Sequence, residues 1–100
     1  MVKLTLLDGK PYTFGPLGFT EAACRLLEEQ ETLGTEDFRA SRFVRVLRDN
    51  MVASLKAGGH SDDDVERACA AVPLPSTGAS GSLIKQVCAA MIDGEGDEVP

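Results

Sequence analysis

Two short apolar runs meet at Asp8-Gly9 near the start of the chain, and this pattern predicts a β-hairpin over residues 2–14. A lone hairpin is at best marginally stable in water, so other elements have to cover its apolar face. The rest of the sequence has helical periodicity. We therefore predict a small α+β domain, mostly α-helical, in which an N-terminal hairpin is followed by a bundle of about four helices.

The length of the turn decides which residues share a face of this hairpin. A two-residue loop at Asp8-Gly9 would divide the apolar residues between the two faces. A three-residue loop over residues 7–9, with Gly9 as the left-handed residue of a bulge, collects them on one face, and we prefer it. The residue pairs in this register are Val2 with Phe14 and Leu4 with Tyr12.

Each helical segment is recognised by apolar residues at spacings of three and four. The four predicted helices cover about residues 20–31, 36–57, 62–72 and 79–92. Their start signals are the caps Thr20, Thr35 and Ser61, and their stop signals are Gly34, Gly58-Gly59 and Pro73-Leu-Pro75. We expect a single domain over residues 1–92, followed by an acidic disordered tail over residues 93–100.

Composition argues against several classes of protein. The chain has 100 residues and a net charge of −6, which opposes nonspecific attraction to nucleic acid or to an anionic membrane. No stretch approaches the roughly 20 apolar residues of a membrane span, and the start lacks the pattern of a secretion signal. We expect a cytoplasmic protein with a core too small for a deep substrate cavity.

The cysteines and the single histidine form no catalytic or metal-binding pattern. Cys24, Cys69 and Cys88 are odd in number and widely spaced, so we expect three core cysteines without a disulfide or zinc site. His60 has no second ligand near it in sequence, and we expect a solvated loop residue. The run His60-Ser61-Asp62 has three triad residue types, but sequence neighbours cannot adopt triad geometry. We predict no enzyme activity, cofactor or metal.

Four arginines recur within one ten-residue window of the second helical segment. This arginine row consists of Arg39, Arg42, Arg45 and Arg48. Steps of three residues spread the row over about half of the helix circumference. Three interpretations stay open: a solvated face with pairs such as Arg45 with Asp49, a docking face for an acidic partner, and a nucleic-acid contact that the net charge opposes.

Several apolar residues remain after one face of each helix is assigned to the core. They are Leu7, Leu17, Phe19, Val46, Val52, Ile84 and Ile92. Either they contact a partner, or they belong to a core deeper than a helical wheel predicts. Together with Arg39, Arg42 and Arg45, they are the candidate partner-binding residues.

The order of turn, helix and cap signals along the chain matches that of a known family. The segments that carry the match are Leu6-Leu-Asp-Gly-Lys10, Pro16-Leu17, the helix end Asp49 to Ala57, the cap segment Gly59 to Val65, Val72-Pro-Leu-Pro75 and the last helix Leu83 to Met91. This combination resembles the tail assembly chaperones of long-tailed bacteriophages and prophages. The resemblance covers roughly residues 1–92, and its motifs are structural rather than catalytic.

The resemblance implies a binding role in the cytoplasm of the host bacterium. Such chaperones coat the long, helical tape-measure protein, keep it soluble, and yield as tail-tube subunits polymerise around it. In this family a longer product of ribosomal frameshifting recruits the tube protein. Coating a long helix calls for many copies, each with a modest apolar groove, and self-association is a further candidate.

Two other classes stay open. A small phage-encoded regulator or inhibitor that binds a host protein would use the same acidic scaffold, and a structural tail-completion protein would be equally small. A gene beside the tape-measure gene favours the chaperone over the inhibitor. A tail-completion protein should remain in purified virions, whereas an assembly chaperone should be absent from them.

Overall fold

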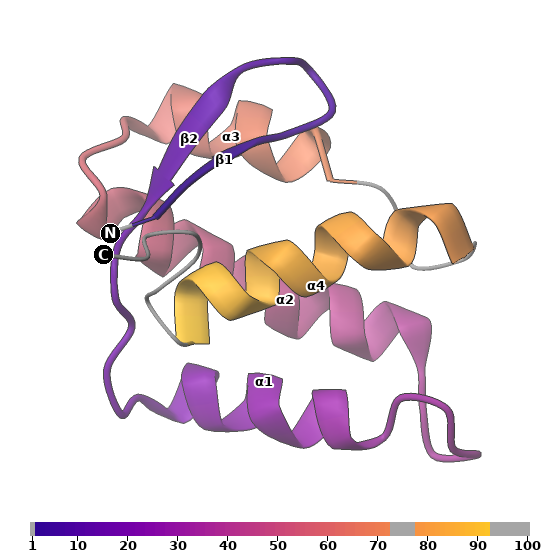
Figure 1. Cartoon of the computed structure of the whole chain (residues 1–100). Coiled ribbons are helices and arrows are strands. Elements are labelled where there is room, and N and C mark those ends of the chain that lie inside the picture. The colour runs from indigo at the N-terminus through magenta and orange to yellow at the C-terminus, as the bar shows by residue number, and fades with distance from the viewer. Residues whose placement is uncertain (1, 73–77, 93–100) are drawn as a thin grey trace, which may run out of the picture.

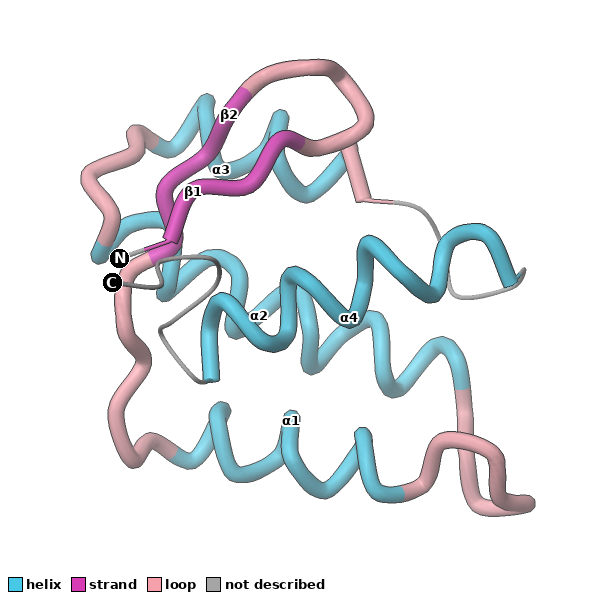
Figure 2. Tube along the Cα trace, viewed as in Figure 1, coloured by secondary structure: helices cyan, strands magenta, loops and turns pink. Residues whose placement is uncertain are grey.

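A two-stranded hairpin and four helices make up the described part of the computed structural model, which comprises residues 2–72 and 78–92. The elements in chain order are β1 (Val2–Thr5), β2 (Pro11–Phe14), α1 (Glu21–Glu31), α2 (Ala40–Ala57), α3 (Asp62–Ala70) and α4 (Gly78–Ile92) (Figure 1). Helix α2 is the longest element and packs against the other three helices and β2. The predicted α+β class, with a hairpin before a mostly helical body, is confirmed (Figure 2).

The hairpin has the register predicted from a three-residue loop. The antiparallel pairs include Val2 with Phe14 and Leu4 with Tyr12. Gly9 has a φ of 77°, the left-handed conformation that the bulge requires. Val2, Tyr12 and Phe14 are all buried, so this register places the apolar residues of both strands against the helices.

Hydrogen bonds and a close approach hold the end of β2 to the C-terminal half of α2. The Gly15 amide donates to the Ser54 carbonyl at 2.9 Å, and the Ser54 hydroxyl donates to the Gly15 carbonyl at 2.7 Å. A Cβ atom on Gly58 would lie 2.1 Å from the Thr13 carbonyl oxygen. Only glycine therefore lets the strand pass this close to the end of the helix.

His60 extends this contact along the outer edge of β2. Its Nε2 accepts a hydrogen bond from the Thr13 amide at 2.8 Å, and its ring is tilted against Tyr12 with centroids 5.5 Å apart. Because Nε2 is the acceptor, the proton lies on Nδ1, which is 3.3 Å from Asp64 Oδ2. The expectation of a solvated His60 was wrong, because the ring accepts from an amide at a sheet edge that pairs with no further strand among the described residues.

We call the contacts of the hairpin with the end of α2 and the following loop the hairpin junction. Its residues are Tyr12, Thr13, Phe14, Gly15, Ser54, Gly58 and His60. Beside it, the Tyr12 hydroxyl donates to Asp8 Oδ2 at 2.6 Å. This hydrogen bond holds the pKa of Asp8 below its usual value, while burial, aided by Asp8, raises the pKa of Tyr12 to about 12.

The core lies where α2 meets the hairpin, α1, α3 and α4. Its largest fully buried side chains are Phe14, Phe43, Leu26, Met51, Leu55 and Met91. The buried amide of Asn50 joins α2 to α1, because its Nδ2 donates to the Ala22 carbonyl at 2.9 Å as well as to Val46 at 2.8 Å. None of the helices in residues 2–72 and 78–92 is long and apolar enough to cross a membrane.

Helix α2 begins at Ala40, four residues later than predicted. Thr35 caps a single turn, in which its hydroxyl accepts from the Asp37 amide at 3.2 Å. The chain is then extended at Arg39, and the Phe38 ring lies against Phe43 at 5.8 Å between centroids. Packing of Phe38 on the core side of α2 thus replaces the first helical turn that the pattern predicts.

The other helix ends are close to those predicted. Thr20 and Ser61 accept hydrogen bonds from the amides of Ala23 and Asp64, as caps do. Helix α3 ends at Ala70, where Ala71 and Val72 form a turn rather than two more helical residues. The predicted stop at residues 73–75 and the predicted acidic tail over 93–100 lie outside the described residues.

Candidate partner-binding groove

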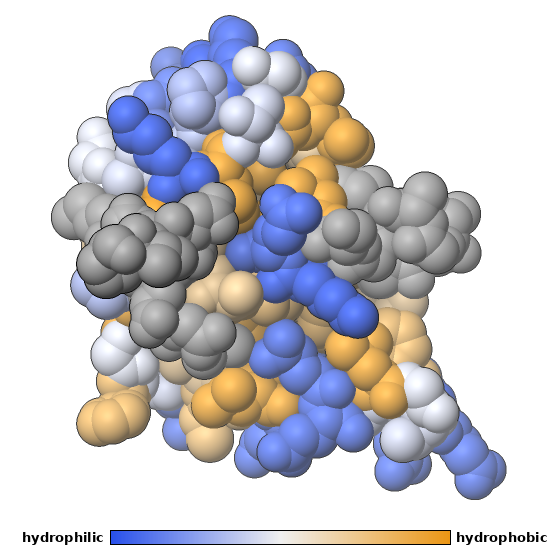
Figure 3. Space-filling model, in the orientation of Figure 1, coloured by the Kyte–Doolittle hydropathy of each residue, from blue (hydrophilic) through white to orange (hydrophobic). Residues whose placement is uncertain are grey.

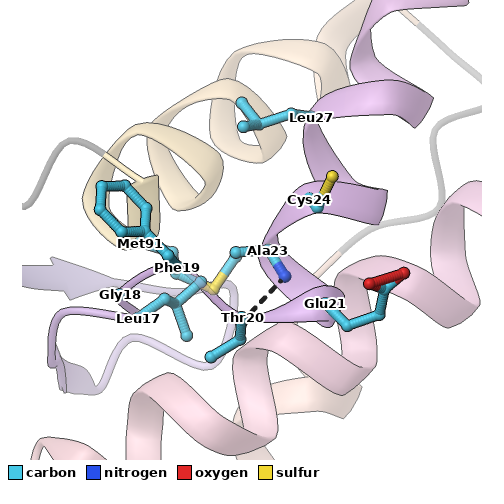
Figure 4. Close-up of a pocket in the computed structure, with 9 residues that line it drawn as sticks. All are labelled: Leu17, Gly18, Phe19, Thr20, Glu21, Ala23, Cys24, Leu27 and Met91. Carbon is cyan, nitrogen blue, oxygen red and sulfur yellow. Dashed lines mark hydrogen bonds between the residues drawn. The ribbon is translucent and has the colours of Figure 1, made fainter.

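An apolar hollow of about 450 Å³ opens to solvent between the start of α1 and the last turn of α4. We call it the α1–α4 groove. Its lining residues are Leu17, Gly18, Phe19, Thr20, Glu21, Ala23, Cys24, Leu27 and Met91 (Figure 4). The space-filling view has apolar surface along α4 and α1, interrupted by hydrophilic side chains (Figure 3).

The segment that enters α1 forms one wall of the groove. Gly18 has a φ of 76°, a conformation that turns the chain just before the cap Thr20. Leu17 is half-buried and packs against the core, whereas Phe19 is fully exposed. An apolar residue directly before a helix cap usually packs against the fourth helical residue, here Cys24. Because Phe19 is fully exposed, no such contact covers it, and its ring stays available at the rim of the groove.

Helix α1 forms the second wall of the groove. Only a narrow face of this helix packs against α2, so other apolar side chains of α1 remain open to solvent. Leu26 is the fully buried residue of this helix. Ala23 is half-buried, while Cys24 and Leu27 are exposed. The side chain of Met91 on α4 also lines the groove and is itself buried.

The three cysteines differ in burial, which corrects the expectation of three core thiols. Cys88 is buried, and burial raises its pKa to about 11. Cys69 is half-buried, and burial raises its pKa as well. Cys24 is exposed in the groove, because the packing face of α1 is narrower than its apolar pattern indicates.

The candidate partner-binding residues do not form one surface. Leu17 and Phe19 both line the groove. Leu7 is exposed at the tip of the hairpin, at the far end of the molecule from α1 (Figure 1). The Leu7 amide donates to the Ala71 carbonyl at 3.0 Å, so the tip is fixed to the end of α3 while its side chain faces solvent.

The remaining apolar candidates lie on α2 and α4. Val46 and Val52 are half-buried and pack against the core. Ile84 is buried at 5% exposure, so its assignment to a partner surface was wrong. It is part of the hydrophobic core, and α4 as a whole contacts α2 and β1. The side chain of Ile92 lies outside the described residues.

Two members of the arginine row tie α2 to its neighbouring helices. Arg42 Nε lies 2.7 Å from Oε2 of Glu29 in α1, and the Glu29 side chain is only 13% exposed. Arg48 lies 2.8 Å from Glu66 in α3. These contacts use two guanidinium groups within the fold, which weakens the interpretation of the row as a free docking face.

The other two arginines behave differently from each other. Arg39 donates to the backbone carbonyls of Glu36 and Phe38, so it closes the turn before α2. Arg45 is exposed and has no ion pair among the residues that the structure describes, so the expected pair with Asp49 is not found there.

Four lining residues were not among the candidates named from the sequence: Ala23, Cys24, Leu27 and Met91. No sequence signal identified them, because an apolar residue before a helix cap is expected to pack against the helix, and only the structure shows that Phe19 does not. Among the described residues, no group of three or more histidine, cysteine or acidic side chains is arranged to hold a metal ion. No family model, curated protein or solved structure matches the chain.

Proposed function

We propose that the chain is a tail assembly chaperone of a long-tailed phage or prophage, and that it acts without catalysis in the host cytoplasm. In this proposal the α1–α4 groove binds a helical segment of the tape-measure protein. The observation that carries the proposal is the fully exposed Phe19 beside an apolar groove.

The chemistry of the groove suits the recognition of an amphipathic helix. Such a helix lays its apolar face into a hydrophobic groove on the partner. Burying a phenylalanine side chain contributes about 1.5–3 kcal/mol, so the exposed Phe19 is a strong anchor for the bound helix. Many copies along one long partner would add their modest affinities through avidity.

Co-expression with the tape-measure protein encoded beside this chain tests the proposal. A tagged chain should keep the tape-measure protein soluble and co-elute with it in a many-to-one ratio. Phe19→Ser should abolish this capture, because it removes the apolar anchor from the groove.

Leu7→Ser is the matched control, since Leu7 is also an exposed apolar residue but lies at the hairpin tip. It should capture the tape-measure protein as the unmodified chain does. An insoluble tape-measure protein in the presence of the unmodified chain would contradict the proposal. Binding of a host protein instead would favour the inhibitor.

A further inference from the structure

We propose that the α1–α4 groove selects a basic amphipathic helix, with lysine or arginine residues flanking its apolar face. This inference rests on the proposed function, because it names the chemistry of the segment that the groove binds. The partner inferred here is basic, whereas the arginine row had suggested an acidic partner.

Exposed glutamates lie along α1, the helix that forms one wall of the groove, and one of them lines it. Glu21 is a lining residue. Glu28 follows Cys24 by four residues and Glu31 follows Leu27 by four, and residues four apart share a helix face. All three glutamates are exposed, so their charges are available to a partner in the groove.

Basic groups near the groove do not balance these carboxylates. Arg25 lies 3.9 Å from Glu21, but both side chains are largely exposed, so the pair is weak. Lys85 on α4 precedes Met91 by six residues, which places it about 9 Å away along the helix axis.

The length of α1 and the positions of the exposed apolar residues determine the length and the apolar spacing expected of the partner helix. Helix α1 has 11 residues, so it extends about 16 Å and matches two to three turns of a bound helix. A segment of about 12 residues with apolar side chains at positions i, i+3 or i+4, and i+7 would cover the exposed Phe19 and Leu27. Basic residues beside that stripe would lie near Glu28 and Glu31.

Three synthetic helical peptides with one apolar face and flanks of lysine, glutamine or glutamate test this inference by fluorescence anisotropy. The full chain should bind the lysine peptide about tenfold more tightly than the glutamate peptide at low salt, and the difference should shrink as salt is added. Glu28→Gln with Glu31→Gln should remove most of this preference. The control, Glu36→Gln with Asp37→Asn, removes the same charge from the exposed loop before α2 and should keep it.

The outcomes separate this inference from the proposed function. Equal affinity for the lysine and glutamate peptides overturns the inference, even where the tape-measure protein is captured. Lysine-peptide binding that Phe19→Ser abolishes supports the inference, even where the tape-measure protein is not captured. Two findings overturn it by naming another occupant: a dimer in light scattering that Phe19→Ser dissociates, or tighter binding of all three peptides by a chain without residues 93–100.

Discussion

The hairpin junction and the α1–α4 groove nearly adjoin in sequence, because only Pro16 separates Gly15 of the junction from Leu17 of the groove. Their apolar and polar groups are nevertheless placed in opposite ways. Phe14 at the junction is 0% exposed, while Phe19 at the groove is 110% exposed. At the junction, the edge amides of Thr13 and Gly15 are paired with His60 and Ser54. At the groove, apolar side chains face solvent without a cover from the described residues.

This difference in burial assigns stability to the hairpin junction and, in the proposed function, binding to the groove. Burial and paired polar groups at the junction hold the hairpin on α2 and contribute to the free energy of unfolding. Apolar surface at the groove contributes little to folding, because it stays exposed in the folded state. In the proposed function, this exposed apolar surface is where the partner binds. Paired substitutions in the two regions can test this division.

The largest effect should come from truncating the two phenylalanines. Phe14→Ala should lower the free energy of unfolding by about 3–5 kcal/mol, because it removes a fully buried ring and leaves a cavity. Phe19→Ala should change it by less than about 0.5 kcal/mol, because its ring contributes little buried area. Urea unfolding followed by circular dichroism measures both. Equal losses from the two substitutions would contradict the division.

Two serines of α2 give the next comparison. Ser54→Ala should cost about 1–3 kcal/mol, because the Gly15 carbonyl at the buried junction loses its hydroxyl donor. Ser41→Ala, on an exposed position of the same helix, should cost less than about 0.5 kcal/mol. The same urea titration reports both values. A loss at Ser41 as large as that at Ser54 would contradict the assignment of this cost to the junction, because alanine itself favours the helix more than serine does.

These local contacts also explain which parts of the structure the sequence could predict. The hairpin register follows from strand alternation and the glycine of the turn, both of which are local. The caps Thr20 and Ser61 depend on residues three positions away. By contrast, the bond from Thr13 to His60 joins residues 47 apart, and no local pattern encodes it.

The groove was only partly predictable for a related reason. Leu17 and Phe19 were identified as candidates because they were not assigned to the buried face of any helix. Cys24 was assigned to the core and Leu27 was not among the candidates, since the width of the buried face of α1 depends on how that helix packs against α2. Ile84 was assigned to a partner surface but is buried, because α4 packs against both α2 and β1, and its own sequence does not encode these contacts.

Titration of Tyr12 tests the burial of the junction directly. The chain has one tyrosine and no tryptophan, so the ultraviolet absorbance of tyrosinate reports this residue alone. Burial raises the pKa of Tyr12 from 10.0 to about 12. A pKa raised in the folded state stabilises the fold fully below pH 10, and this stabilisation is lost as pH rises toward 12. A phenol that titrates at its ordinary value in the folded chain would contradict the burial.

The smallest effect should come from the arginine row. Arg42→Glu should destabilise the chain by about 1 kcal/mol, because it replaces a partly buried ion pair with repulsion against Glu29. Arg45→Glu should change stability by less than about 0.5 kcal/mol and leave partner capture intact. Urea unfolding and pull-down of the tape-measure protein check the two variants. If Arg45→Glu stays folded but no longer captures the tape-measure protein, the arginine row on α2 would again be the candidate docking face.

Amide hydrogen exchange of the chain, alone and in complex with the tape-measure protein, tests most directly whether the groove is the binding site. The account predicts that the partner adds protection to residues 17–27 and to the last turn of α4, and leaves exchange at the hairpin junction unchanged. New protection at the hairpin tip or along the arginine row, with residues 17–27 unaffected, would contradict it.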